Sequence, residues 1–133
     1  MHELSVAYAV VSTVERALPV PGARVLQVRL LIGELSGVDS QALRFAYDVA
    51  VLGTALSDAV LVIEHGPIVI ACPTCAEQII ESARDFRCPV CAMPCGDVVR
   101  GKEMEIVDII LDDSARTDLD DSARTDDPVL VRA

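Results

Sequence analysis

Two Cys-x-x-Cys pairs lie close together in this chain and constrain its fold more than any other feature. The pairs are Cys72/Cys75 and Cys88/Cys91, and twelve residues separate them. Each pair can turn two sulfurs toward one point, and two pairs at this spacing complete the tetrahedron of thiolates that zinc takes in structural sites. Because four protein ligands leave no open position, the spacing predicts a structural Zn(II) site at these four cysteines.

A fifth cysteine, Cys95, follows the second pair closely. It is either a competing ligand or a spare thiol. We favour the spare thiol, because the two pairs already complete a tetrahedral set.

The apolar pattern on either side of the cysteines predicts both helices and strands. Apolar residues recur at helical spacing in two segments, alternate in one further segment and form apolar runs in two others. The expected helices cover 4–18 and 40–52, and the expected strands cover 25–32, 60–70 and 103–111.

This element order predicts an α+β fold, with two helices on a sheet of roughly three strands. The α/β domain is expected to comprise 1–71 plus 98–111. The cysteines lie in an expected zinc-ribbon module, 72–97, that is inserted before the last strand of that domain.

The remaining segment, 112–133, contains an eight-residue repeat that begins at Asp112 and again at Asp120. It holds seven acidic residues and three arginines. The period is too short for a solenoid unit, and the composition predicts an acidic, disordered tail.

Charge and hydropathy restrict the partners of the chain. The net charge is −10 and Lys102 is the only lysine, which argues against binding to a nucleic acid backbone. Neither a secretory signal nor an apolar run of bilayer length is visible in the sequence. We therefore expect a cytoplasmic protein without a membrane partner, and in the cytoplasm cysteines at this spacing are typical of metal ligands.

The start of the chain offers a second set of metal donors. The amine of Met1, the amide nitrogen and imidazole of His2, and the amide or side chain of Glu3 can close chelate rings on one ion. A planar array of nitrogen donors suits Ni(II) or Cu(II). The alternative is an exposed helix start, where Glu3 interacts favourably with the helix dipole.

The metal motifs occur together with four sequence segments in a recognisable order. The segments are Met-His-Glu-Leu-Ser at the start, Ile-Gly-Glu-Leu-Ser-Gly-Val at 32–38, Leu-Arg-Phe-Ala-Tyr at 43–47 and Gly-Lys-Glu-Met-Glu-Ile at 101–106. Over about residues 1–111 the sequence resembles the HypA/HybF family of nickel-delivery accessory proteins for nickel-iron hydrogenase maturation. The acidic tail lies outside the resemblance.

The resemblance implies a role for each motif. Met1, His2 and Glu3 would bind transferable Ni(II), and the four cysteines would hold structural Zn(II). Asp39, at the start of the second helix, matches an acidic residue that assists nickel in some members, although a helix cap is the more ordinary role for it. The implied partners are a GTPase accessory protein, the hydrogenase large-subunit precursor and, for some members, urease accessory proteins.

The sequence therefore favours a metallochaperone that is not an enzyme. It leaves open whether the protein is a monomer or a homodimer. Two other classes compete with this interpretation: a zinc-ribbon module that binds nucleic acid or protein, and a rubredoxin-like electron-transfer protein with iron in the four thiolates.

Overall fold

The computed structural model describes residues 2–112 and 129–132, and the chain divides into two compact units. The first, here called the helical unit, comprises Met1–Leu30, Asp39–Val62 and Ile106–Ala133. The second, the cysteine unit, comprises Leu31–Val38 and Ile63–Glu105. The compact unit that holds the cysteines therefore begins earlier and ends later than the expected module 72–97.

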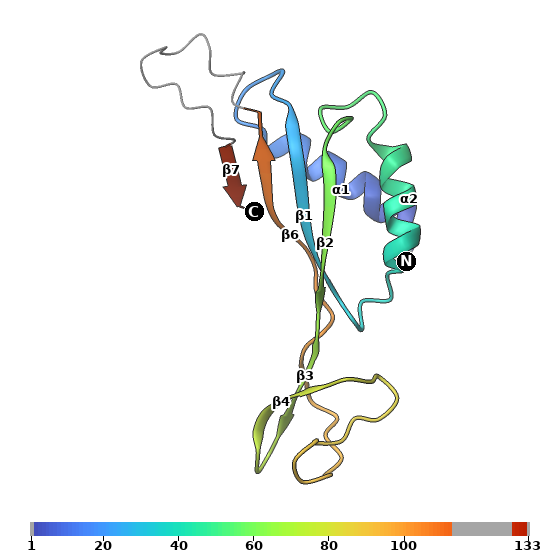
Figure 1. Cartoon of the computed structure of the whole chain (residues 1–133), viewed down its shortest axis with the longest axis vertical. Helices are drawn as coiled ribbons and strands as arrows, with labels where there is room; N and C mark the ends of the chain where they lie inside the picture. Colours follow the sequence, from blue (N-terminus) through green and yellow to red (C-terminus); the bar gives the residue numbers. More distant parts are fainter. Residues whose placement is uncertain (1, 113–128, 133) are drawn as a thin grey trace. The chain divides into compact units, whose positions relative to one another are not determined.

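The described residues form helices and strands in a mixed order (Figure 1). In chain order they are α1 (Glu3–Ala17), β1 (Val25–Gly33), α2 (Ser40–Ala50), β2 (Val60–Gly66), β3 (Ile68–Cys72), β4 (Ala76–Ile80), β5 (Val98–Arg100), β6 (Met104–Leu111) and β7 (Val129–Arg132). The expected α+β fold class is confirmed, and α1, α2, β1 and β6 lie within a few residues of their expected bounds.

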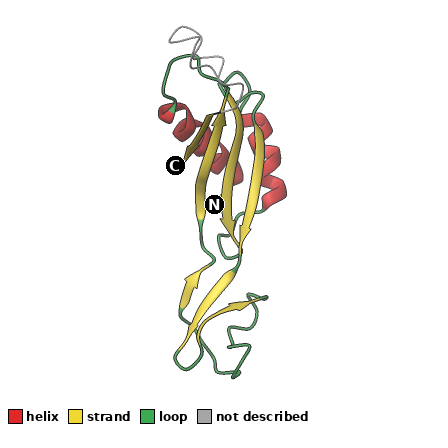
Figure 2. Ribbon diagram, turned by 60° about the vertical axis from the view of Figure 1, so that its left-hand side comes forward, coloured by secondary structure: helices red, strands yellow, loops and turns green. Residues whose placement is uncertain are grey.

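Both helices of the helical unit lie on one face of the sheet (Figure 2). Asp39 is the N-cap residue of α2, and its carboxylate accepts the backbone N–H groups of Gln41 and Ala42. Its buried stripe includes Leu43 and Tyr47, and the Tyr47 hydroxyl donates to the carbonyl oxygen of Ala59. This hydrogen bond satisfies the one polar atom that the buried tyrosine brings into the core.

Helix α1 buries a stripe of residues that the helical period alone did not identify. Val6, Val10 and Val14 are buried, whereas Leu4 and Tyr8 are 45% and 52% exposed. Apolar residues cover a broad arc of this helix, so several stripes satisfy the helical period, and packing selects one of them.

The sheet that carries the helices has four strands, in the order β2-β1-β6-β7, where about three were expected. The additional strand is β7, which pairs antiparallel with β6 from Asp108↔Arg132 to Leu111↔Val129. Four residues of the segment expected to be a disordered tail therefore form a strand, and the rest of that expectation, for 113–128 and 133, lies outside the described residues. The mean composition of the tail concealed a short run of strand-forming residues at its end.

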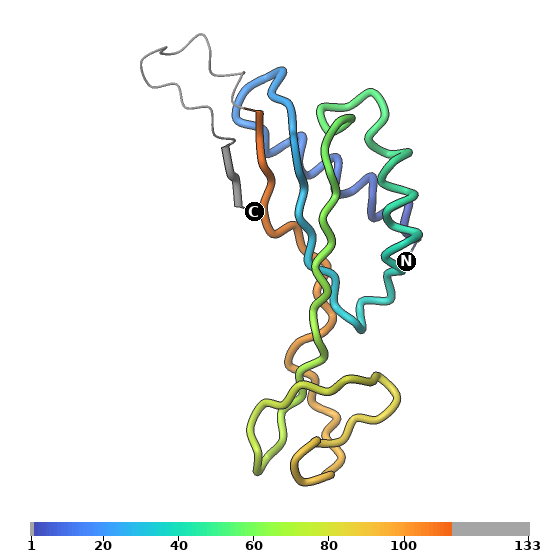
Figure 3. The backbone as a smooth tube through the Cα atoms, viewed as in Figure 1, coloured from blue at the N-terminus to red at the C-terminus, as the bar shows by residue number. Residues whose placement is uncertain are grey.

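The strand expected over 60–70 is divided at Pro67 into β2 and β3. Proline has no N–H to donate to a sheet, so the ladder is interrupted at this residue. β3 then belongs to a second sheet, of order β4-β3-β5, inside the cysteine unit. Between β4 and β5 the backbone doubles back on itself (Figure 3), with an isolated bridge between Arg87 and Pro94.

Glycines allow three segments of the cysteine unit to meet closely. The Gly33 N–H donates to the carbonyl oxygen of Glu103 at 2.7 Å. A Cβ atom on Gly33 would lie 2.1 Å from the carbonyl oxygen of Gly101, and one on Gly66 would lie 3.1 Å from the Glu103 carboxylate. At Gly33 only a residue without a side chain permits this approach of backbones.

Candidate metal centre

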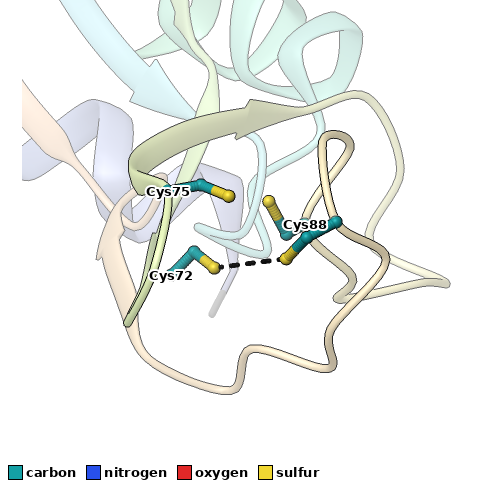
Figure 4. A group of neighbouring side chains, drawn as sticks. Cys72, Cys75 and Cys88 are labelled. Carbon is teal, nitrogen blue, oxygen red and sulfur yellow. Dashed lines mark hydrogen bonds between the residues drawn. The ribbon is translucent and has the colours of Figure 1, made fainter.

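The four cysteines of the two pairs meet at one point in the cysteine unit. All four Sγ atoms of Cys72, Cys75, Cys88 and Cys91 lie within 4.8 Å of one another. The Cys72 and Cys91 Sγ atoms are 3.6 Å apart. Figure 4 shows the side chains of Cys72, Cys75 and Cys88 directed toward one another. Ligands about 2.3 Å from a shared zinc ion lie roughly 3.8 Å apart in a tetrahedron, so the donor set fits zinc.

Each pair sits on a turn that ends in a residue with left-handed backbone. Ala76 follows the first pair and Ala92 follows the second, and both have φ of 62°. The Ala92 N–H donates to the carbonyl oxygen of Cys88 at 2.8 Å. The two turns thus end in the same backbone conformation.

Thr74, between the cysteines of the first pair, contacts three of the four sulfurs. Its Oγ1 lies 3.4 Å from Cys72 Sγ, 3.6 Å from Cys75 Sγ and 3.8 Å from Cys91 Sγ. A hydroxyl at this position can donate to a thiolate and orient it. Thr74 was not among the residues expected at the site, and the one feature of the sequence that points to it is its hydroxyl between two expected ligands.

The sulfurs differ in acidity. The Thr74 hydroxyl, helped by the N–H groups of Thr74 and Cys75, lowers the pKa of Cys72 to about 5. Thr74 also acts to lower the pKa of Cys75, but Cys91, desolvation and the remaining sulfurs outweigh it and raise that pKa to about 11. The backbone N–H of Met93 lowers the pKa of Cys91. Thiolates this close repel one another, and a divalent cation is what would allow all four to ionise together.

Cys95 is buried near the cluster without belonging to the group of four. Its thiol donates to the carbonyl oxygen of Met93 at 3.3 Å. Desolvation raises the pKa of Cys95, which keeps the thiol protonated. Cys95 therefore forms part of the small core of the cysteine unit.

The expected nickel donors lie in the helical unit, at the start of α1. His2 is exposed and is the N-cap residue of α1, with no side-chain capping bond. Met1 falls outside the described residues. The Glu3 carboxylate accepts the backbone N–H of Asp39 at 3.2 Å, and this bond lowers the pKa of Glu3. The structure therefore places Glu3 beside Asp39.

Comparisons with known proteins agree on one family. The family model described as "Hydrogenase/urease nickel incorporation, metallochaperone, hypA" matches residues 1–111. The chain belongs to the HypA family. A hydrogenase maturation factor HypA from Chloroflexus aurantiacus is 46% identical over 109 residues, which cover 80% of this chain and 96% of the relative. Its counterpart from Streptomyces avermitilis is 39% identical, covering 85% of this chain and 88% of the relative.

The fold itself also resembles that of a solved structure. The solution structure of the Ni metallochaperone HypA from Helicobacter pylori aligns with a TM-score of 0.57 and 22% identity, over 82% of this chain and 96% of that one. At this identity the likeness concerns the fold. HypA membership confirms the expected nickel metallochaperone of hydrogenase maturation. Neither the nucleic acid module nor the rubredoxin-like protein is supported by any of these matches.

Proposed function

We propose that this HypA protein carries Ni(II) on its first three residues and holds Zn(II) permanently in its four cysteines. The observation that carries this proposal is the contrast between two donor sets in different units. Four sulfurs converge into a closed set, whereas the His2 imidazole is exposed at the start of a helix. A closed tetrahedron suits a permanent ion, and an exposed nitrogen set suits an ion that must be transferred.

The start of α1 supports nickel binding by the backbone. The first N–H groups of a helix have no acceptor within the helix, so the amide nitrogens of His2 and Glu3 can serve as ligands without breaking helical bonds. The positive end of the helix dipole also favours the negative charge of a deprotonated amide. Because the Glu3 carboxylate already accepts the Asp39 N–H, we propose that Glu3 contributes its amide nitrogen.

The proposal extends to partners and location. The protein would bind nickel without catalysing a reaction and would deliver it, in the cytoplasm, to the hydrogenase large-subunit precursor with the help of a GTPase partner. The relatives quoted above are named for hydrogenase maturation, and we therefore propose hydrogenase rather than urease as the recipient. None of the helices within residues 2–112 is long and apolar enough to cross a membrane.

The chain offers a matched pair of variants for testing the nickel site. His2 and His65 are its only histidines, and both are exposed. Calorimetric titration of untagged protein with Ni(II) should show at least a tenfold loss of affinity in His2→Ala and no change in His65→Ala. Adding one residue before Met1 should also weaken binding, because it moves the amine away from the chelate. Equal affinity in His2→Ala and the parent protein would overturn the proposed site.

Asp39 needs a variant that separates its two expected roles. Asparagine caps helices about as well as aspartate, so Asp39→Asn should preserve α2 while removing the charge. Its carboxylate accepts two backbone N–H groups of α2, at 2.9 and 3.2 Å, which supports the capping role. We expect unchanged helix content and nickel affinity; a selective loss of nickel affinity would identify Asp39 as an auxiliary ligand.

A further inference from the structure

The β6 strand is an interior strand of its sheet only because β7 covers it. The sheet order is β2-β1-β6-β7, so β7 supplies the outer neighbour of β6. The match to the HypA family ends at Leu111, which is also the last residue of β6. The Chloroflexus aurantiacus relative is matched over 96% of its length by 80% of this chain. β7 is therefore an addition beyond the family match.

The part of β6 that β7 covers would tend to pair with other strands if it were exposed. The paired residues run from Asp108 to Leu111, and three of the four are aliphatic: Ile109, Ile110 and Leu111. The fourth, Asp108, is only 1% exposed and forms an ion pair with Arg29 of β1, so its charge is not available at the edge. An uncovered strand of this kind presents a row of N–H and C=O groups to any other strand.

The opposite edge of the sheet is protected in a different way. A carbonyl of β2, that of Leu61, accepts a hydrogen bond of 3.0 Å from the Arg44 guanidinium. Glu64 and His65, also on β2, are exposed. Charged and polar side chains on an edge strand discourage pairing with another chain, and the aliphatic run of β6 lacks them. The two edges thus avoid association by different means: side chains at β2 and a further strand at β6.

We propose that the β6 edge at Asp108–Leu111 is a self-association surface that the chain's own strand β7 occupies. When β7 is removed, this edge pairs with the same edge of a second copy. β7 lies antiparallel to β6, so the edge already accepts a strand in that direction. Two β6 strands paired antiparallel are related by a two-fold axis, which gives a closed dimer rather than a filament.

Removal of the tail tests the proposal directly. The full chain and a chain ending at Asp112 are compared by sedimentation over a wide range of concentration. We expect the shortened chain to double its mass as concentration rises, with the full chain unchanged over the same range. Helical circular dichroism and zinc content establish that the shortened chain is folded. The proposal would be overturned if the shortened chain were folded and its mass stayed, at every concentration, that of the full chain less the mass of the tail.

Two proline variants of the full chain give an independent test. Alternate residues of an antiparallel strand direct their N–H groups to the neighbouring strand. One of Leu130 and Val131 therefore donates to β6, and the other directs its N–H away from it. Proline is tolerated on an edge strand where the N–H points outward. We expect one of Leu130→Pro and Val131→Pro to associate like the shortened chain and the other to behave like the parent; two variants that both behave like the parent would contradict the proposal.

Hydrogen exchange locates the effect on β6. In the full chain, the amides of Asp108–Leu111 that face β7 should be protected. In the shortened chain they should exchange at least tenfold faster at low concentration and regain protection as the dimer forms. Equal exchange of these amides in the two chains at low concentration would show that β7 does not cover the edge.

Discussion

The helical unit and the cysteine unit are stabilised by different means. The helical unit buries aliphatic side chains from two helices and a sheet, among them Val14, Val28 and Leu43. The buried cluster of the cysteine unit has six members, and three of them are cysteines: Cys72, Cys88 and Cys95. A small segment with so little apolar volume needs a cross-link or a metal to hold its fold. With Zn(II) bound to its four thiolates as proposed, the cysteine unit would gain from the metal the stability that the helical unit gains from buried apolar side chains.

Loss of the metal should produce the largest difference in stability between the two units. Structural zinc contributes about 10–16 kcal/mol in small domains, so Cys88→Ala or a strong chelator should unfold the cysteine unit. Both helices belong to the helical unit, so circular dichroism at helical wavelengths should change little. NMR spectra or hydrogen exchange would report the loss in the cysteine unit. Cys95→Ala, which removes a sulfur outside the group of four, should retain zinc; a parallel loss of helix signal on chelation would contradict the comparison.

The converse variant removes apolar volume from the helical unit. Leu43 is 1% exposed, and Leu43→Ala should lower the free energy of unfolding by about 2–5 kcal/mol, because it leaves a cavity. Zinc content, measured by metal analysis, should remain that of the parent. Leu52→Ala is the matched control, since Leu52 is 73% exposed and its truncation should change stability by about 0.5 kcal/mol or less. Zinc loss in Leu43→Ala alone would show that the units are not independently stabilised.

Within the cysteine unit, Thr74→Val should weaken the metal site without removing a ligand. Supporting residues of this kind commonly change metal affinity by about 10–100-fold, and we expect the lower end. Because the Thr74 hydroxyl lowers the pKa of Cys72, its loss raises that pKa, and protons then compete with the metal at higher pH. The midpoint of acid-driven zinc release, followed with a chromogenic chelator, should therefore move to higher pH. Thr13→Val, on the exposed face of α1, should leave the midpoint unchanged.

The smallest expected effect is a gain in stability at the second turn. Left-handed backbone costs a non-glycine residue about 1–2 kcal/mol. Replacement by glycine removes this strain, but part of the gain is lost because glycine makes the unfolded chain more flexible. Ala92, with φ of 62°, should therefore be improved by Ala92→Gly, by about 0.5–1 kcal/mol in the cysteine unit. Chelator-competition and thermal unfolding would measure the gain. Ala83→Gly, at an exposed position without positive φ, should give no gain, and a loss of stability in Ala92→Gly would contradict the strain assigned to this turn.

Local sequence patterns predicted much of the fold. The stripe of α2 that includes Leu43 and Tyr47, and the cap at Asp39, are formed by residues within a few positions of one another. Strand β1 was likewise visible from its alternation and β6 from its run of apolar residues. For such elements the deciding interactions are short-range, so the sequence pattern and the final structure agree. The buried stripe of α1 was less determined, because Leu4 and Tyr8 fit the helical period without being buried.

Elements that depend on a distant partner were harder to predict. β7 forms where β6 offers an edge, and nothing within residues 129–132 specifies that neighbour. Gly33, Gly66 and Glu103 occur in three separate segments, and only the fold shows that they touch. The contact between Thr74 and Cys91 joins the two turns and likewise depends on how the intervening loop closes.

The sequence alone determined that four cysteines can share one ion and that a histidine follows the first residue, because covalent spacing limits where neighbouring ligands can reach. It also determined membership of the HypA family. The tertiary structure decided which edge of the sheet is covered, where the strand at Pro67 changes sheets, and that the Glu3 carboxylate accepts the Asp39 N–H. These features depend on hydrogen bonds between groups from distant segments. Because nearly every residue has the same backbone N–H and C=O groups, the sequence does not specify which partner each of them will meet.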